Sequence, residues 1–159
     1  RPIRDFESFA VPRSGIETYA NRGLAGIDGN ISTAMGIASK HDETYAVIGD
    51  LAFLHDISAL ANQTDDTLTI IVVDNDGGGI FSTLPQRGVD GFETIFGTPH
   101  GRDIAAIVKG FGVSVEEVRS GKELHIALQR IHPKLMPDRE ANADSIYEVV
   151  KKFKELVLL

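Results

Sequence analysis

The stretch that decides the fold is residues 44–76, TYAVIGDLAFLHDISALANQTDDTLTIIVVDND. Residues 44–48 and 68–73 are short β-branched apolar runs bounded by turn residues, which is typical of buried strands. Between them, apolar residues recur at helical spacing over residues 53–63, so the stretch predicts a strand, a helix and a second strand. Because the second run has no polar alternation, it favours a parallel sheet that is covered on both faces.

Further elements are expected on both sides of this unit. Upstream, residues 18–20 predict a weak short strand, which a glycine-rich turn (Gly23, Gly26, Gly29) and a helix over residues 31–39 follow. Downstream, we expect a helix carrying an apolar stripe, then a strand over residues 112–115 and a helix over residues 122–131 that ends before Pro133. The stripe consists of Ile104, Ile107, Val108 and Phe111.

The C-terminal residues predict one more helix, which begins near Asn142 or Asp144 as its N-cap. No repeat, low-complexity tract or linker interrupts the chain, although residues 77–101 form a long loop-rich stretch of the kind that often carries function. We therefore expect one α/β domain over residues 1–159. The apolar face of the last helix would consist of Ile146, Val149, Val150, Phe153 and Leu156.

The composition is that of an acidic globular protein. The 159 residues carry a formal net charge of −7, whereas a nucleic-acid surface would cluster Lys and Arg, so we expect no nucleic-acid partner. The absence of Cys excludes disulfides and Cys-ligated zinc and fits a reducing, cytoplasmic location. No apolar run could span a bilayer and the N-terminus has no apolar signal core. Because the chain does not begin with Met, we expect a fragment, a processed product or a trimmed chain.

Polar residues follow both confident strands where each strand ends. Asp50 comes directly after the first strand, and Asn75 and a run of glycines follow the second. Ligands of an open α/β sheet bind outside the carboxyl ends of its strands, so these loops should share one crevice. A carboxylate, an amide oxygen and a backbone carbonyl are ligands for Mg²⁺ or Ca²⁺, and the helix that begins after Asp50 favours a phosphate. The pattern predicts a divalent ion that holds a diphosphate.

Other interpretations of these residues are weaker. A Gly-Asp pair after a strand is often only a turn, and Asp74 could begin a calcium loop, but the twelfth position of that loop is Pro85 instead of Glu. The run that begins at Gly77 lacks the third glycine of a dinucleotide fingerprint, and the chain has no P-loop and no G-x-S-x-G motif.

Gly49-Asp50, followed 25 positions later by Asn75, resembles the motif of thiamine-diphosphate-dependent enzymes. Residues 19–29, 49–56 and 75–86 resemble in particular the family of synthases that act in menaquinone biosynthesis. The resemblance spans nearly the whole chain and implies the C-terminal diphosphate-binding domain of a larger enzyme, a three-layer α/β/α fold with a mostly parallel central sheet. Asp74 stands where the motif usually has a first Asn, a position not expected to bind the metal.

The resemblance also implies roles for individual residues. Mg²⁺, with Mn²⁺ as a substitute, would be held by Asp50, Asn75 and the carbonyl of Gly77. Substrate carboxylates would be bound by Arg4 and Arg22, next to apolar pocket residues Ile80 and Phe81, and bidentate Arg recognition suits such groups. Thiamine diphosphate would contact Gly26, Ile27, Gly49, Asp50, Leu51, Ala52, Asn75, Gly77 and Ile80, with Ile27 supporting the thiazolium ring against the aminopyrimidine ring.

The family decarboxylates 2-oxoglutarate and adds the succinyl carbanion to isochorismate. The resemblance implies a pyrimidine-binding domain, usually of a second subunit, that supplies the catalytic Glu, so this chain holds no catalytic residue of its own and is expected to be inactive alone. It further implies a homodimer or homotetramer. Two alternatives stay open: the same domain of another thiamine-dependent 2-oxoacid decarboxylase or acetolactate-type enzyme, and a Mg²⁺-dependent phosphate-binding module without chemistry.

The histidines are expected to play supporting roles. His55 follows the metal-site Asp50 on the same predicted helix, where a core or supporting position is expected. His100, His125 and His132 are interpreted as surface or structural residues.

Overall fold

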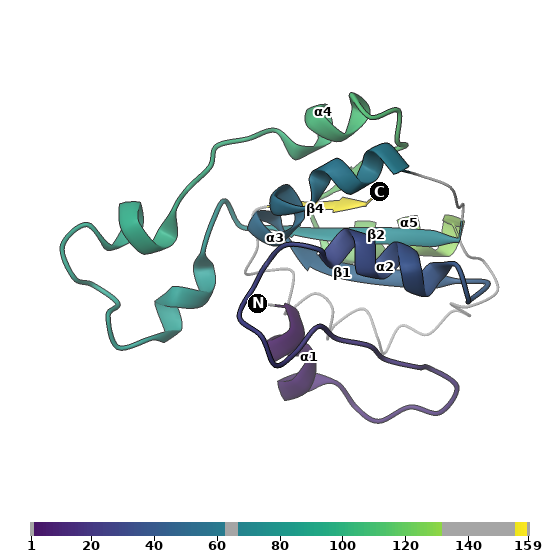
Figure 1. Ribbon diagram of the computed structural model, residues 1–159, viewed down its shortest axis with the longest axis horizontal. Helices are drawn as coiled ribbons and strands as arrows, with labels where there is room; N and C mark the ends of the chain where they lie inside the picture. The colour runs from purple at the N-terminus through teal and green to yellow at the C-terminus, as the bar shows by residue number, and fades with distance from the viewer. Residues whose placement is uncertain (1, 63–66, 132–154, 159) are drawn as a thin grey trace.

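The computed structural model describes residues 2–62 and 67–131 and the backbone of residues 155–158 (Figure 1). The helices are α1 (Pro2–Phe9), α2 (Asn30–Ala38), α3 (Asp50–His55), α4 (Ile104–Lys109) and α5 (Gly121–Ile131). Shorter helical turns are η1 (Ile57–Asn62), η2 (Gly79–Thr83) and the π-helical turn η3 (Glu93–Gly97). The strands are β1 (Thr44–Gly49), β2 (Leu68–Asp74), β3 (Glu116–Val118) and β4 (Glu155–Leu158).

These strands form one sheet in the order β1-β2-β4-β3. β1 and β2 are parallel, and Gly49 lies opposite Val73, so both strands end at the same edge. β4 runs antiparallel to both β2 and β3, which means that β1, β2 and β3 share one direction. Three of the four strands therefore run in the same direction, as predicted for a mostly parallel sheet, and β4 runs in the opposite direction between β2 and β3.

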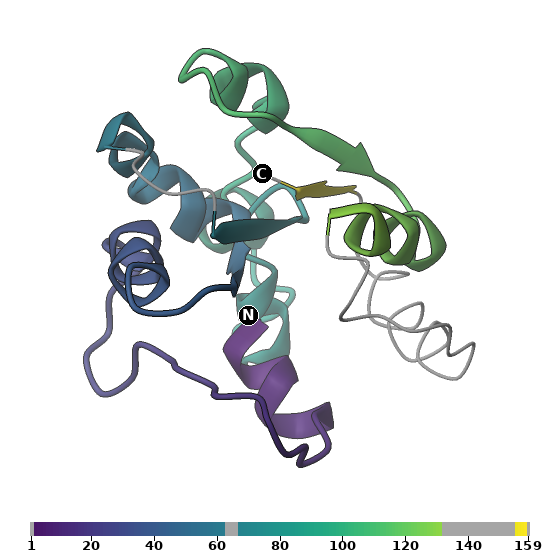
Figure 2. The ribbon, with the colours of Figure 1, turned by 90° about the vertical axis from the view of Figure 1, so that its right-hand side faces the viewer.

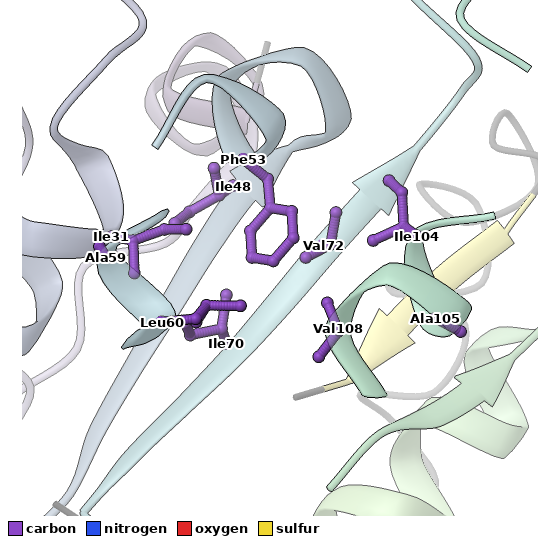
Figure 3. Close-up of a cluster of buried hydrophobic side chains, with 10 residues drawn as sticks. All are labelled: Ile31, Ile48, Phe53, Ala59, Leu60, Ile70, Val72, Ile104, Ala105 and Val108. Carbon is purple, nitrogen blue, oxygen red and sulfur yellow. The ribbon is translucent and has the colours of Figure 1, made fainter. Parts of the chain in front are cut away.

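Alternate residues of β2 enter two separate cores. Ile70 and Val72 pack with α2, α3, η1 and α4 on one face, around Phe53, which is fully buried (Figure 3). Ile71 and Val73 pack with α5 on the other face. Figure 2 shows the sheet between α2 on one side and α5 on the other. Because both faces are covered, residues 70–73 of β2 are all apolar and buried, and the three-layer α/β/α architecture is confirmed.

Side-chain caps fix where two of these helices begin. Asp103 accepts the backbone N–H of Ala106 at 2.8 Å at the start of α4. Before α5, the Ser120 hydroxyl accepts the Glu123 N–H at 3.2 Å, and the Glu123 carboxylate accepts the Arg119 N–H at 2.7 Å. The second pair is a variant of the capping box, in which the Glu123 carboxylate accepts the N–H of the residue before the N-cap Ser120.

The helix predicted over residues 53–63 is wrong in its continuity, because it divides into α3 and η1 at Asp56. The Asp56 carboxylate accepts the backbone N–H of Ser32 at 2.8 Å and lies 3.2 Å from its hydroxyl. This contact ties the end of α3 to the first turn of α2. A bond between residues so far apart in sequence leaves no trace in helical periodicity.

Several expected boundaries also differ. Residues 18–20 are not in a strand. The strand expected over residues 112–115 is β3 at 116–118, and Val113 and Val115 pack against the core around Phe53. The α4 stripe is correct for Ile104 and Val108, but Phe111 lies beyond the helix and is 38% exposed.

Leu156 lies in strand β4, opposite Val73 and Val118, and not in the predicted last helix. Short apolar runs fit either type of element, and here pairing with two neighbouring strands decides for the strand. His132, Pro133 and residues 142–154 of that helix lie outside the described residues.

Residues 77–101, called the arm below, project away from the sheet and carry η2 and η3 (Figure 1). The arm is held together by aromatic rings: those of Phe81 and Phe96 lie 5.8 Å apart, and those of Phe92 and Phe96 are stacked at 5.5 Å. Across the described ranges, no helix has both the length and the apolar character that crossing a membrane requires.

Candidate metal and diphosphate site

The site is built where the parallel strands β1 and β2 end. Asp50 begins α3 directly after β1, and Asp74 is the last residue of β2. Both residues are buried in the described structure, with exposed fractions of 2% and 8%. Two buried carboxylates at one sheet edge need compensating donors or a cation.

Asp50 receives donors from its own loop and from the loop after β2. Its Oδ1 accepts the Leu51 N–H at 2.8 Å, while Oδ2 accepts the Gly77 N–H at 2.7 Å and the Asn75 N–H at 3.3 Å. Backbone donors to a carboxylate are among the stronger hydrogen bonds in proteins. The structure therefore joins Asp50, Asn75 and Gly77, which the sequence assigned to the metal site, in one set of bonds.

His100 joins the same cluster from the end of the arm that returns to the sheet. Its Nε2 lies 3.2 Å from Asp50 Oδ2 and 3.6 Å from Asp74 Oδ1, and its side chain is only 10% exposed. Its Nδ1 accepts the Arg102 N–H at 2.9 Å, which assigns the proton of a neutral ring to Nε2. Of the surface and structural positions expected for His100, the surface one is wrong, because the arm returns its ring to Asp50. The only signal in the sequence was its place at the end of the loop-rich stretch.

The environment of Asp74 disfavours its charged form. Burial, the largest effect, raises the pKa of the Asp74 carboxyl, and the neighbouring Asp50 raises it further. The Asp76 backbone N–H, which Asp74 accepts at 2.8 Å, and the nearby His100 act in the opposite direction. The net shift is upward, so Asp50 and Asp74 repel one another unless a proton or a cation lies between them.

The donor chemistry at this edge suits a divalent cation. Ligand atoms of Asp50, Asp74 and His100 all lie within 4.8 Å of one another. The carboxylate of Asp50, the amide of Asn75 and the carbonyl of Gly77 add the oxygen donors that Mg²⁺ prefers. The chemistry of the donor groups present therefore fits a hard cation.

The glycines of this turn leave no room for side chains. A Cβ at Gly77, whose φ is 133°, would lie 2.1 Å from the Gly97 carbonyl oxygen, and a Cβ at Gly79 would lie 2.5 Å from Nδ2 of Asn75. Such distances are shorter than any real contact of a Cβ atom. Because these glycines have no side chains, the first residues of the arm can lie in direct contact with the Asn75 side chain.

The other predicted cofactor residues lie on three different segments. Leu51 and Ala52 follow Asp50 in α3 and are half-buried, and Ile80 is half-buried in η2. Gly26 and Ile27 lie in the exposed segment before α2, where Ile27 is 44% exposed. His55 is exposed, and its Nδ1 donates to the Leu51 carbonyl at 2.8 Å, so the expected core position is not found.

Glu7 pairs with Arg22, one of the two predicted substrate arginines. Nη1 of Arg22 lies 2.6 Å from Glu7 Oε1, and both side chains are about half exposed. The Arg22 hydrogen bond lowers the pKa of Glu7, and the charge of Arg4, on the same helix as Glu7, adds to this. Arg22 thus already pairs with a carboxylate, the group that it is predicted to bind.

Comparison with known proteins identifies the class. Residues 6–137 match the family described as "Thiamine pyrophosphate enzyme, C-terminal TPP binding domain", and the chain belongs to this family. Its matched relatives include proteins named 2-succinyl-5-enolpyruvyl-6-hydroxy-3-cyclohexene-1-carboxylate synthase. The one from Thermobifida fusca is 44% identical over 80% of this chain and 24% of its own length. Those from Nocardia farcinica and Bacillus cytotoxicus are 46% and 44% identical, over 74% and 81% of this chain and 23% of their own lengths.

The predicted resemblance to these synthases is therefore confirmed. The chain spans about a quarter of the length of the curated relatives it matches.

Proposed function

We propose that this chain binds Mg²⁺ and the diphosphate of thiamine diphosphate as part of a synthase that decarboxylates 2-oxoglutarate and adds the succinyl carbanion to isochorismate. The observation that carries the proposal is the buried Asp50 carboxylate, which links the ends of β1 and β2 through the N–H groups of Asn75 and Gly77. The relatives' printed name supports the reaction class.

In this function, Asp50, Asn75 and the Gly77 carbonyl would hold Mg²⁺, with Mn²⁺ as a substitute. Asp50 would contribute charge and the other two neutral oxygens, a set suited to a cation that keeps part of its shell for phosphate oxygens. The backbone donors of Asn75 and Gly77 fix the orientation of the Asp50 carboxylate before any ligand arrives. The cofactor, when bound, supplies the electron sink for the carbanion.

The remaining predicted residues would orient the organic groups. Ile27 and Ile80 would present apolar surface to the cofactor, with Phe81 beside the second substrate. Arg4 and Arg22 would bind substrate carboxylates, since Arg22 already pairs with the carboxylate of Glu7 and its side chain is about half exposed. A substrate carboxylate would then compete with Glu7 for Arg22.

The proposal extends to parts that the chain does not hold. A pyrimidine-binding domain, from a second subunit of a homodimer or homotetramer, would supply the catalytic Glu, and the enzyme would act in the cytoplasm. The chain by itself should then bind cofactor without turnover. Mixing the chain with 2-oxoglutarate, Mg²⁺ and thiamine diphosphate and following CO₂ release tests this, and robust turnover would refute it.

Calorimetric titration tests the binding function itself. Thiamine diphosphate should bind the chain only with Mg²⁺ present, and Asp50→Ala should remove most of that affinity. Asp42→Ala is the matched control, because Asp42 is an exposed carboxylate in the turn before β1. Preference for nucleotides over thiamine diphosphate would instead favour a phosphate-binding module. Product analysis of the full-length parent with 2-oxoglutarate and isochorismate separates the synthase from other thiamine-dependent decarboxylases.

A further inference from the structure

The two ends of the arm meet in a neck formed by residues 76–78 and 97–101. The Gly78 N–H donates to the Gly97 carbonyl at 2.6 Å, and a Cβ on Gly77 would lie 2.1 Å from the same oxygen. The outgoing and returning segments therefore touch backbone to backbone. This contact places the end of the arm directly against the turn that follows β2.

Asp76 makes the polar contacts across this neck. Its Oδ1 accepts the backbone N–H of His100 at 3.1 Å and that of Gly101 at 2.8 Å. Its own N–H donates to Asp74 Oδ1 at 2.8 Å. The two acceptor contacts join residues 24 and 25 positions apart, so they are long-range bonds and not those of a local turn.

The backbone of the neck is held in an uncommon conformation on both sides. Within the described ranges, the non-glycine residues with positive φ are Asp76 at 58° and Thr98 at 42°. Such conformations cost free energy, although Asp and Asn tolerate them better than most residues. Their occurrence on opposite sides of one neck indicates that the bonds across it hold both segments in place.

We propose that Asp76 is a positioning residue that holds the returning end of the arm on the turn after β2. By fixing the backbone of His100, it places the imidazole against Asp50 and Asp74. Cation binding at Asp50 and the position of the arm are thereby coupled. The part of the inference that concerns cation and cofactor affinity rests on the proposed function.

Two substitutions at Asp76 distinguish the contribution of its carboxylate oxygen from that of its backbone conformation. Asp76→Gly removes the acceptor but adopts positive φ without strain. Asp76→Asn keeps both an acceptor oxygen and tolerance of positive φ. A purely conformational role predicts that both variants behave like the wild type, whereas the positioning role predicts that only the Asn variant does.

Hydrogen exchange of the full 159-residue chain tests the contact itself. In Asp76→Gly, the amides of His100 and Gly101 should exchange roughly tenfold faster or more, as expected for the loss of hydrogen bonds to a charged acceptor. In Asp76→Asn they should stay within a few-fold of wild type, and the β1 and β2 amides should keep their protection in both variants. Unchanged exchange in the Gly variant, equal loss in both, or loss of protection throughout the sheet would overturn the proposal.

Calorimetry of the same variants tests the coupling. Asp76→Gly should weaken Mg²⁺-dependent thiamine diphosphate binding by about tenfold, because the neck is no longer held in place. Asp76→Asn should bind thiamine diphosphate with the affinity of the wild type. Faster exchange at His100 with unchanged cofactor affinity would overturn the coupling. Failure of the wild-type chain to bind thiamine diphosphate would contradict the proposed function instead, and the exchange result would still decide whether Asp76 holds the arm.

Discussion

Asp50→Asn should destabilise the chain even without a metal, although the Asn side chain has the same shape as the Asp side chain that it replaces. The carboxylate accepts N–H groups on both oxygens: that of Leu51 on Oδ1, and those of Asn75 and Gly77 on Oδ2. An amide has only one acceptor oxygen, so its NH₂ group must face a backbone donor in either orientation. The orientation with fewer conflicts turns the NH₂ toward Leu51 and leaves a single mismatch.

The magnitude follows from these contacts. One buried donor without a partner costs about 1–3 kcal/mol, and the remaining bonds weaken when their acceptor loses its charge. Relief of the repulsion between Asp50 and Asp74 offsets part of this cost. The net loss in the free energy of unfolding should be about 2–4 kcal/mol, which lowers the melting temperature of a chain of this size by about 4–16 °C.

Urea unfolding followed by circular dichroism, in the presence of EDTA, measures this difference. Asp42→Asn is the matched control, because the same chemical change at an exposed site should leave the midpoint nearly unchanged. If Asp50→Asn were as stable as Asp42→Asn, the hydrogen-bond set around Asp50 would not exist as described.

Four further outcomes are expected. The folded state raises the pKa of Asp74, so it favours the protonated carboxyl group. In urea unfolding with EDTA, the stability of the wild type should therefore fall relative to Asp74→Asn as the pH rises from about 4 through the raised pKa. A difference in urea midpoints that does not change with pH would contradict this. Phe53→Ala, in the centre of the first core, should cost about 3–5 kcal/mol in the same assay. Ser120→Ala should cost about 1 kcal/mol by removing the cap of α5, and no loss would argue against the capping box. In the full-length enzyme, Arg22→Lys keeps the charge but loses the planar fork, so KM for the carboxylate substrates should rise while cofactor affinity stays the same.

The sequence predicts best what local pattern determines. β1 and β2 were recognised because the residues of β2 alternate between two covered faces, with Val72 in one core and Val73 in the other. The ends of these strands then placed Asp50 and Asn75 at one edge, since parallel neighbours end together. This part of the candidate site follows from strand order alone.

What the sequence did not predict depends on contacts between distant residues. The break between α3 and η1 arises from the bond of Asp56 to Ser32, 24 positions away. His100 reaches Asp50 over 50 positions because the arm folds back, and no periodicity encodes that return. Leu156 lies in a strand because two neighbouring strands leave a place between them, which is a property of the whole sheet.

The location of a bound cation tests the central claim most directly. Crystals of the chain grown with Mn²⁺ and thiamine diphosphate, measured at the manganese absorption edge, would give an anomalous peak at the metal. We predict that this peak lies within coordination distance of the Asp50 carboxylate, the Asn75 side-chain oxygen and the Gly77 carbonyl. A peak held by Asp74 and His100 without Asn75, or a peak away from the ends of β1 and β2, would contradict it.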